Sequence, residues 1–564
     1  MNDDPTLMLL CAHTSGSFDE AIEHYDAAHE ALILRMKSEK SIYSSAFYQN
    51  CLRYANCLEY VGDIDMAEEK YLEALPGGGL VTGDYAYFLH KKKKNYEQAE
   101  KYYKLALQQY PGHSSVHLRY ANFLRHVKKD LQLAEKHYTL ACDSNYKNAD
   151  ASGTYASFLH GVLKRYDDAQ IYYEKAVNED PTHVNNYCNY GLFLSEEKGD
   201  YSHAERLYKH AMELDPHHAN TLYNYAVMLD THLGRKDEAE ELYTRVIEID
   251  SRHPYALYNL AVLLEDNLKM LKEETAQYKK SLLQKNKTKR AGRFDVSDFN
   301  DYYEDDIVVN DSIMQKYIDD DSKFQDMSKR IAALRATVLD LYERATDADP
   351  HDPTAKADCA RYIYTEYGSD RCSTEDKELY KEKYAEKVDL LLIEAHRLDP
   401  QLEVALYTVA SICHNYKKDS VKAESFVKKL LSANPKHVSG MHLLAIIYLE
   451  STSGEKNLGN TRRGSINDGS AANDKTKTVE DAFLLLQKCA ECSKNPSKSL
   501  VEYINAVDKY GTKRHKLAAI AYCQQKRYSN FTDFENKPDN KLEYAMSVLQ
   551  HAAGKRGNDG ELST

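Results

Sequence analysis

Asparagines at a fixed interval are the most distinctive chemistry in this sequence. Asn189, Asn224 and Asn259 stand 35 residues apart, and Asn185 and Asn220 precede the first two by four residues. Each asparagine side chain offers one hydrogen-bond acceptor and two donors, and residues four apart share one face of a helix. Such a column could bond to the NH and CO groups of an extended peptide without reading its side chains. We therefore treat these asparagines as candidate peptide-binding residues.

The sequence offers little for catalysis or metal binding. It contains no glycine-rich phosphate loop, no HExxH and no nucleophile elbow, so we expect a non-catalytic protein without a cofactor. The one CxxC, Cys489 and Cys492, has no partner pair, whereas structural zinc takes four ligands. Histidines recur in the loops that close the repeats described below: His113, His183, His218, His253 and His437. Packed helices stand about 8–10 Å apart and zinc ligands lie about 2 Å from the metal, so we expect loop and helix-start residues there and no metal site.

A strict 35-residue register must position these side chains. One column of the register holds Tyr85, Tyr120, Tyr155, Tyr190, Tyr225 and Leu260; a second holds Ala99, Ala134, Ala169, Ala204 and Ala239; a third holds Tyr103, Tyr138, Tyr173, Tyr208, Tyr243 and Tyr278. Within a unit, apolar residues recur at helical spacing in two segments of about 14 residues. A polar turn such as EEKGDYSH separates the two segments, and Pro181 or Pro216 closes the second. Each unit is therefore predicted to be a helical hairpin that buries its apolar face only against its neighbours.

The order of key residues in a unit resembles the tetratricopeptide repeat family. The residues that carry the resemblance in one unit are Tyr190, Gly191, Leu194, Ala204, Tyr208, Ala211 and Pro216. The units are one residue longer than the family's usual 34, and we place the extra residue in the turn between the helices. The resemblance implies an all-α, right-handed solenoid of stacked antiparallel hairpins that acts as a scaffold or adaptor. A partner segment would then bind in a concave groove lined by the first helices.

The residue before each Tyr–Ala or Tyr–Gly pair is expected to face this groove. The series is Arg53, Asp84, Arg119, Thr154, Asn189, Asn224 and Asn259. In families of this kind asparagine ladders grip peptide backbones, so the resemblance assigns peptide binding to the three asparagines, with Asn185, Asn220 and Arg119 beside them. The alternative is that these side chains are merely solvated.

Two other functions stay open as alternatives. Members of the family that bind the C-terminal carboxylate of heat-shock chaperones use lysines and asparagines, whereas here Asp84 would repel a carboxylate and Leu52 and Ser115 replace the lysines. Only an atypical chaperone cofactor would fit. The other alternative is a component of an RNA-processing assembly built on related half-repeats, to which LYERA (341–345) has some likeness, although that motif leans on Trp and the chain has none.

The periodicity predicts two arrays joined by a linker. We expect an N-terminal array over 1–285, a charged and flexible linker over 286–329, and an irregular C-terminal array over 330–564. The C-terminal array contains a segment, 451–478, that is low in apolar residues and is expected to be disordered. Ser465 follows two arginines in this segment and is a possible phosphorylation site.

Composition limits the partners and the compartment. The formal net charge of −14 over 564 residues argues against a broad nucleic-acid interface, which needs clustered Lys and Arg. No run of 18 apolar residues is present and the N-terminus is acidic, so we expect neither a membrane span nor a signal peptide. The expected partner is a protein or peptide and the expected compartment is the cytoplasm, with the nucleus possible because of the basic run 285–293.

Overall fold

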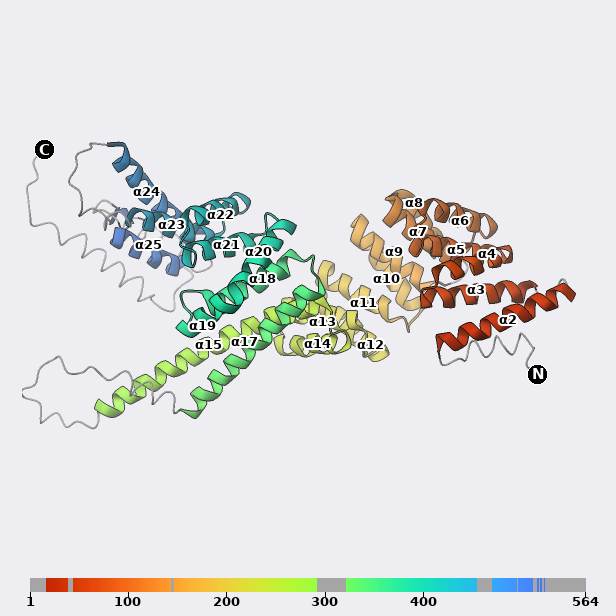
Figure 1. Cartoon of the computed structure of the whole chain (residues 1–564), viewed down its shortest axis with the longest axis horizontal. Helices are drawn as coiled ribbons and strands as arrows, with labels where there is room; N and C mark the ends of the chain where they lie inside the picture. Colours follow the sequence, from red (N-terminus) through yellow and green to blue (C-terminus); the bar gives the residue numbers. More distant parts are fainter. Residues whose placement is uncertain are drawn as a thin grey trace, which may run out of the picture. The chain divides into compact units, whose positions relative to one another are not determined.

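In the computed structural model of the chain, the described residues form helices joined by turns (Figure 1). It describes residues 17–38, 44–143, 147–291, 321–453, 469–493 and 496–510, together with 515, 516, 518, 519 and 522. No strand occurs in these ranges. The chain divides into two compact units, Met1–Ile249 and Asp250–Thr564. The prediction of an all-α fold is confirmed.

The first unit is a row of helical hairpins. Its helices are α2 (Phe18–Ser38), α3 (Ser44–Val61), α4 (Ile64–Ala74), α5 (Gly79–Lys91), α6 (Tyr96–Gln109), α7 (Ser114–Phe123), α8 (Leu131–Cys142), α9 (Ala149–Phe158), α10 (Tyr166–Glu179), α11 (Val184–Phe193), α12 (Tyr201–Leu214), α13 (Ala219–Met228) and α14 (Lys236–Ile249), with a 3₁₀ turn, η1 (Leu75–Gly77), before α5. Each first helix from α5 to α11 packs on the second helix of its own hairpin and on the first helix of the next one, and α13 packs on α14. The predicted stacking of hairpins is confirmed.

Small residues allow the two helices of a hairpin to approach closely. Ala121, Ala156 and Ala226, each directly after a buried tyrosine of a first helix, are fully buried. At Gly191, an added Cβ would lie only 3.0 Å from a ring carbon of Tyr208. The alanines and this glycine therefore leave space that the buried tyrosines of the second helices fill.

The thirty-fifth residue is wound into the end of the first helix. Four successive first helices end in a five-residue π turn: η2 (Leu124–Lys128), η3 (Leu159–Leu163), η4 (Leu194–Lys198) and η5 (Leu229–Leu233). After η2, the N–H groups of Lys129 and Asp130 both donate to the carbonyl of Leu124, and Lys129 is left-handed at φ 58°. A π turn is one way in which a helix accommodates a single extra residue, so the insertion sits in the helix end and not in a loose loop.

At several seams of the first unit, an acid, a tyrosine and a cation join one repeat to the next. At one seam Glu205 of α12 accepts a hydrogen bond from the Tyr225 hydroxyl of α13 (2.7 Å) and from Arg235 Nη1 at the start of α14 (3.0 Å). Equivalent trios are Glu135 with Tyr155 and Arg165, and Glu68 with Tyr85 and Lys93. A tyrosine fills the gap between repeats with its ring while its hydroxyl reaches a polar partner. Tyrosines such as Tyr155 and Tyr225 thus serve both packing and hydrogen bonding in this Trp-free chain.

The second unit continues the helical hairpins with longer and less regular members. Its helices are α15 (Pro254–Ala291), α17 (Ser322–Ala348), α18 (Pro353–Ile363), α19 (Thr374–Leu379), α20 (Ala385–Leu398), α21 (Glu403–Asn415), α22 (Ser420–Ala433), α23 (Val438–Ser453), α24 (Gly469–Cys492) and α25 (Pro496–Tyr510), with π turns η7 (Tyr364–Gly368) and η8 (Tyr380–Tyr384). The α21–α22, α23–α24 and α24–α25 pairs pack as neighbours. Within the described residues, hairpins therefore continue as far as α25.

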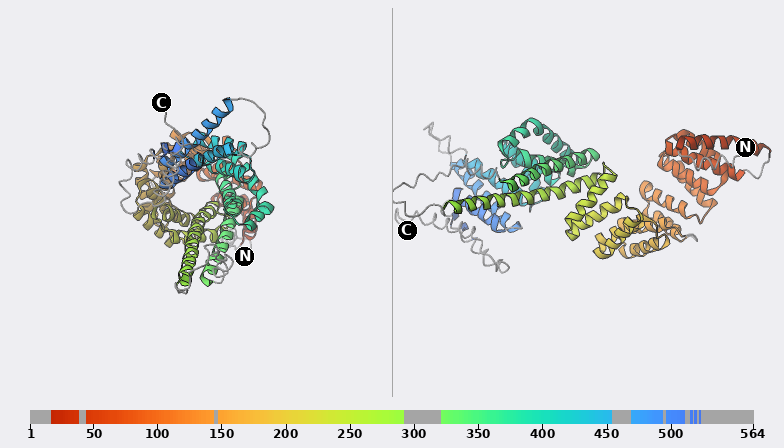
Figure 2. Two further views of the ribbon diagram at one scale, coloured as in Figure 1. Left: turned by 90° about the vertical axis from the view of Figure 1, so that its left-hand side faces the viewer. Right: turned by 90° about the horizontal axis from the view of Figure 1, so that it is seen from below.

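The first hairpin of the second unit differs from the predicted register. α15 runs unbroken from Pro254 to Ala291, so Tyr278 lies in that helix and not, as the register predicted, in a separate second helix. The segment EDNLKMLKEET (265–275) contains no Gly or Pro that would end a helix. α17, which carries the buried Tyr342 and Ala345, packs along α15 as its partner instead (Figures 1 and 2).

The expected linker therefore lies between the two helices of one hairpin. Residues 286–291 end α15 and residues 322–329 begin α17, and only 292–320 lie outside the described residues. The first compact unit ends at Ile249, earlier than the end at 285 that the period suggested. α15 groups with the second unit because its long contact is with α17.

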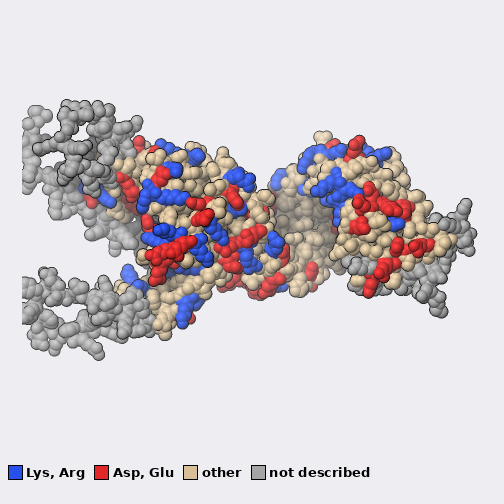
Figure 3. Space-filling model, in the orientation of Figure 1, with Lys and Arg blue, Asp and Glu red and all other residues tan. Residues whose placement is uncertain are grey.

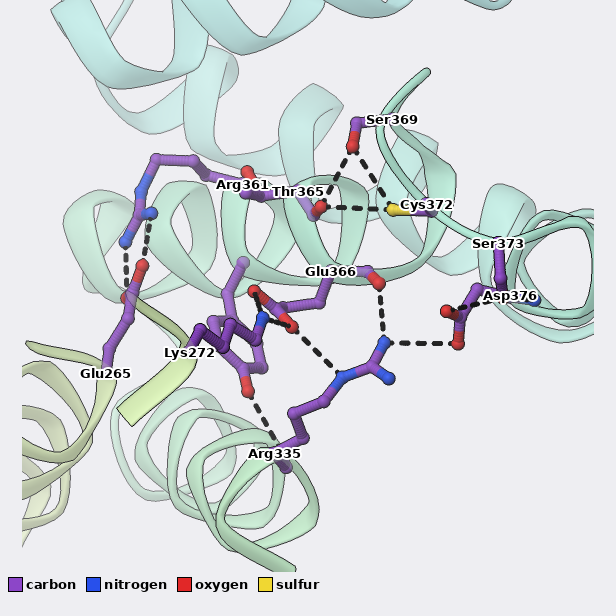
Figure 4. A network of polar contacts seen from close by, with 11 residues as sticks. Glu265, Lys272, Arg335, Arg361, Thr365, Glu366, Ser369, Cys372, Ser373 and Asp376 are labelled. Carbon is purple, nitrogen blue, oxygen red and sulfur yellow. Dashed lines mark hydrogen bonds and ion pairs between the residues drawn. The ribbon is translucent and has the colours of Figure 1, made fainter. Parts of the chain in front are cut away.

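Ion pairs fasten α15 and α17 to the next helix (Figure 4). Arg361 of α18 forms a two-pronged pair with Glu265 of α15, with N–O distances of 2.7 and 2.8 Å. Glu366 in η7 accepts from Lys272 Nζ of α15 (2.6 Å) and pairs with Arg335 Nε of α17 (3.0 Å). Such forked and shared contacts hold planar groups in fixed geometry, so they set the register of the hairpin against α18.

The predicted disordered segment is partly helical at its edges. Residues 451–453 end α23 and residues 469–478 begin α24. Ser465 lies outside the described residues, and its phosphorylation stays a prediction. Cys489 and Cys492 lie in α24, where Cys489 is buried and donates to the Val438 carbonyl (3.5 Å) while Cys492 is exposed.

Candidate functional site: the first-helix surface

The first helices of the first unit present one continuous set of accessible positions. α5, α7, α9, α11 and α13 are neighbours in sequence order. On each, the residue before the buried tyrosine is half-buried: Asp84, Arg119, Thr154, Asn189 and Asn224. The residue four positions earlier is exposed: Leu80, Ser115, Asp150, Asn185 and Asn220. We call these ten positions the first-helix surface.

Two of the predicted asparagines keep their whole amide group available. Asn189 of α11 is half-buried and Asn220 of α13 is exposed. Within the described residues, neither side chain has a recorded hydrogen bond to the protein. Leu192 and Val227, three residues after the half-buried positions of α11 and α13, are also half-buried. This part of the surface therefore offers amide donors and acceptors beside apolar side chains.

The other two asparagines of this unit are partly committed to the protein. His218 Nδ1 accepts a hydrogen bond from the backbone N–H of Thr221 (3.3 Å), so the ring proton lies on Nε2. His218 Nε2 therefore donates to Asn185 Oδ1 (2.9 Å). Asn224 Nδ2 donates to the sulfur of Cys188 (3.4 Å). One polar group of each amide is thus engaged between neighbouring helices, which fixes the orientation of the side chain.

Arg119 is neutralised by the neighbouring repeat. Its Nη1 donates to Asp84 Oδ1, and its guanidinium lies 4.7 Å from the ring centroid of Tyr87. A carboxylate ligand would have to displace Asp84 from this pair, which adds to the repulsion expected from the sequence. The structure thus brings Arg119 onto the same surface as the asparagines, but already paired with an acid.

Asn259 belongs to α15 and hence to the second compact unit. It is half-buried at the position of α15 that corresponds to Asn189 and Asn224. Its prediction as a peptide-binding residue therefore stays a prediction.

The loop histidines begin helices. His113, His218, His253 and His437 each accept, through Nδ1, the N–H of the residue three positions later, at 2.9–3.4 Å. His183 precedes α11 and its Nε2 lies 2.7 Å from Asp150 Oδ1. An imidazole nitrogen at these positions satisfies one of the N–H groups that a helix start leaves open, so the expectation of helix-start residues is confirmed.

A buried polar cluster joins α2, α3 and α4. Cys51 Sγ lies 3.6 Å from His29 Nδ1 and 3.7 Å from Glu73 Oε2, a ligand set that a metal ion could use. Lys70 Nζ, however, lies 3.3 Å from His29 Nε2 and 3.2 Å from Glu73 Oε1. Burial, with Glu73 nearby, raises the pKa of Cys51 to about 12, so the thiol is protonated. Lys70 supplies the positive charge within this cluster.

Asn186 is a structural asparagine that the sequence did not distinguish from its neighbours. It is 3% exposed, and its Nδ2 donates to the Ala149 carbonyl of α9 (3.2 Å). Gly153 leaves room for it, because a Cβ there would lie 2.1 Å from Asn186 Oδ1. The run NN at 185–186 places one asparagine outward and one inward, and the glycine one repeat earlier was the available signal.

Comparison with protein families identifies the repeats. Models described as tetratricopeptide repeat match residues 196–263, 88–113 and 159–183. The chain carries tetratricopeptide repeats. Repeats of this family imply a protein-interaction scaffold and are generally non-catalytic. A search of curated proteins found no match.

Solved structures of low similarity match parts of this chain. YrrB, described as a TPR protein with an unusual peptide-binding site, is 22% identical over 34% of this chain and 97% of its own, with a TM-score of 0.27. PilF of Pseudomonas aeruginosa is 14% identical over 53% and 99%, with a TM-score of 0.34. A monomeric mutant of IFIT1 with m7Gppp-AAAA is 12% identical over 86% and 91%, with a TM-score of 0.36. At these TM-scores, none of the three indicates what this chain binds.

No helix in the described ranges is both long enough and apolar enough to cross a bilayer.

Proposed function

We propose that the first unit is a scaffold that holds an extended segment of a partner protein on the first-helix surface. The single observation that supports this function is the pair Asn189 and Asn220, whose amide groups have no recorded partner in the described part of the chain and lie on adjacent helices. An amide can donate to a carbonyl and accept from an N–H of a peptide backbone. Backbone recognition of this kind accepts many sequences.

Asn185 and Asn224 support the same site as orienting residues. Each is fixed through one polar group, to His218 or to Cys188, and retains its other amide atom for a ligand. Leu192 and Val227 then provide an apolar contact for alternate side chains of the peptide. An extended chain advances about 3.3 Å per residue, so about three residues would span the 8–10 Å between adjacent helices.

The size of the expected effect follows from ordinary hydrogen bonds. Each net hydrogen bond contributes about 1 kcal/mol, and 1.4 kcal/mol changes a dissociation constant tenfold. Truncation of both free amides removes up to four donors and two acceptors, of which a bound peptide would use about two or three. We therefore expect affinity to fall roughly thirtyfold.

Peptides selected against the full chain test the proposal. Phage display would supply ligands, and fluorescence anisotropy would compare their dissociation constants for the wild type and the Asn189→Ala, Asn220→Ala double variant. Asn178→Ala is the matched control, because Asn178 is exposed on α10, a second helix. A loss confined to the double variant supports the proposal. Selected peptides that bind both variants as well as the wild type would place the site elsewhere.

We further propose that the scaffold works in the cytoplasm. The nine cysteines in the described ranges are free thiols, as is usual in a reducing compartment. Imaging of the full chain with a fluorescent tag tests this; a signal confined to the secretory pathway or to the nucleus would contradict it.

A further inference from the structure

One cation in each hairpin turn is already used to join repeats. Lys93 Nζ lies 2.8 Å from Asp65 Oδ1 on the preceding hairpin, Lys128 Nζ lies 2.6 Å from Glu100 Oε2, and Lys198 Nζ lies 2.8 Å from Asp167 Oδ1. Arg165 and Arg235 bind acids of the preceding second helices in the same way. These contacts show that successive turns stack along one edge of the first unit.

Three further lysines on this edge have no such partner. Lys94, Lys129 and Lys164 follow one another at intervals of 35 residues, and all three are exposed. Within the described residues, none has a recorded ion pair or hydrogen bond through its side chain. We call them the lysine edge. Figure 3 shows that Lys and Arg side chains gather in one area of the first unit, apart from most of its Asp and Glu.

The lysine edge stands at a backbone position that favours glycine. Lys94, Lys129 and Lys164 are left-handed, with φ of 54°, 58° and 56°. At the equivalent position of the next two repeats stand Gly199 and Gly234, with φ of 65° and 64°. A left-handed residue after a helix is usually glycine because a side chain is strained there. Lysine, unlike asparagine, has no short polar group to offset that strain locally.

Strain that persists without a local reason points to a role outside the fold. Glycine completes the same turn in two repeats, so the fold itself does not require lysine. We propose that the lysine edge binds an acidic segment of a partner protein whose carboxylates recur at the spacing of the repeats. This site is separate from the first-helix surface and goes beyond the proposed function.

The spacing suits a peptide. Adjacent packed helices stand about 8–10 Å apart, which an acid at every third residue of an extended chain matches at about 3.3 Å per residue. Tyr96 and Leu131, two residues after Lys94 and Lys129, are 41% and 38% exposed. They provide apolar contacts between the charges.

The surroundings disfavour a nucleic acid on this edge. Asp130 adjoins Lys129, and the acids Asp167 and Asp168 follow Lys164. A nucleic acid carries a phosphate at every nucleotide and would bring some of them against these acids. A peptide can place carboxylates only opposite the lysines and neutral residues opposite the acids. The chain's net charge of −14 adds to the repulsion of a polyphosphate.

The test removes the charges without harming the turns. The variant Lys94→Gly, Lys129→Gly, Lys164→Gly replaces strained residues by the residue that the other repeats use, so its Tm is expected to stay the same or to rise. The probe is a short fluorescein-labelled peptide with glutamate at every third position and leucine and serine between, titrated with the full chain at low salt. Since exposed ion pairs each contribute modestly, loss of three should weaken binding about tenfold.

A control variant removes the same number of positive charges from lysines that lie outside the hairpin turns. Lys101→Gln, Lys136→Gln, Lys147→Gln removes three exposed lysines outside the turns and should leave binding unchanged. The proposal is supported if only the glycine variant loses affinity and salt weakens the wild-type complex. It is overturned if the wild type does not bind the peptide, if both variants bind equally, or if single-stranded oligothymidine binds more tightly than the peptide and is lost in the glycine variant.

Discussion

The seam at Glu205 provides the sharpest test of how the repeats hold together. Its carboxylate accepts hydrogen bonds from Lys209 (2.8 Å), Tyr225 (2.7 Å) and Arg235 (3.0 Å). These contacts, with that of Lys209 the strongest, lower the pKa of Glu205 to about 2. A group whose pKa is depressed by folding stabilises the folded state above its unfolded pKa.

The expected magnitude follows from the pKa. Lowering it from the 4.5 of an unperturbed glutamate to about 2 corresponds to about 3 kcal/mol at neutral pH. The Glu205 side chain is 21% exposed, and solvent screening reduces the value to about 2 kcal/mol. Glu205→Gln keeps the shape and one acceptor but removes the charge. We expect it to lower the free energy of unfolding by about 2 kcal/mol at pH 7.

Urea denaturation followed by circular dichroism measures this loss, and hydrogen exchange of α12–α14 shows whether it is local. The wild type should lose the contribution of Glu205 as the pH falls from about 4.5 toward 2, so the two proteins should converge there. Glu213→Gln is the control, because Glu213 lies on the same helix but is 75% exposed. Equal stability of Glu205→Gln and Glu213→Gln at pH 7, or a difference independent of pH, would refute the reasoning.

Two further predictions follow from packing and burial. Gly153→Ala should destabilise the first unit by about 2 kcal/mol in urea denaturation, since the added Cβ would lie 2.1 Å from Asn186 Oδ1. The control is Gly161→Ala, whose added Cβ has nothing within 4 Å. This control should be neutral or stabilising by about 0.5 kcal/mol. Burial lowers the pKa of His90 to about 4, so stability should fall as the pH drops from about 6.5 toward 4. His90→Gln should reduce that slope in thermal unfolding between these pH values; an unchanged slope would show that His90 does not titrate on unfolding.

The repeat architecture was predictable because its signal is redundant. At 35-residue intervals, Tyr155 is one of five tyrosines, Ala169 one of five alanines and Tyr173 one of six tyrosines. An exception at one position therefore leaves the register intact. The helix starts at His218 and His437 were also predictable from the sequence. The structure adds that the ring Nδ1 of each histidine accepts a backbone N–H of the first turn. The period identifies which residues of successive repeats are equivalent, and equivalent residues occupy the same position in each helical hairpin.

Exceptions to the period were not predictable from it. Tyr278 kept the interval, yet it lies inside α15 because the helix has no residue that would end it. The helix that packs on α15 is α17, which begins only at Ser322, after α15 has ended at Ala291. It is recognised as the partner by its contacts with α15. The role of a helix therefore depends on a long-range pairing that local spacing does not encode.

Side-chain partners were the least predictable part of the site. Asn185, Asn186 and Asn189 are the same residue type on one helix, yet one binds His218, one is buried against Ala149 and one has no recorded partner in the described ranges. From the sequence, Arg119 would be taken as an unpaired cation, but in the structure it forms an ion pair with Asp84, one repeat earlier. Each outcome depends on a residue about 35 positions away, so the sequence indicates the surface but not which of its groups are available.

The seams also explain where this fold leaves room for binding. A tyrosine, an acid and a cation join repeats at several seams, as at Glu135, Tyr155 and Arg165. Two kinds of position lie outside these trios: the half-buried residue before each first-helix tyrosine, and the left-handed residue after each first helix. In the first unit these positions vary between repeats while the seams recur, since the former hold Asp, Arg, Thr and Asn and the latter hold Lys or Gly. Because a change there leaves the trios intact, binding specificity can differ at these two positions while the seams are kept.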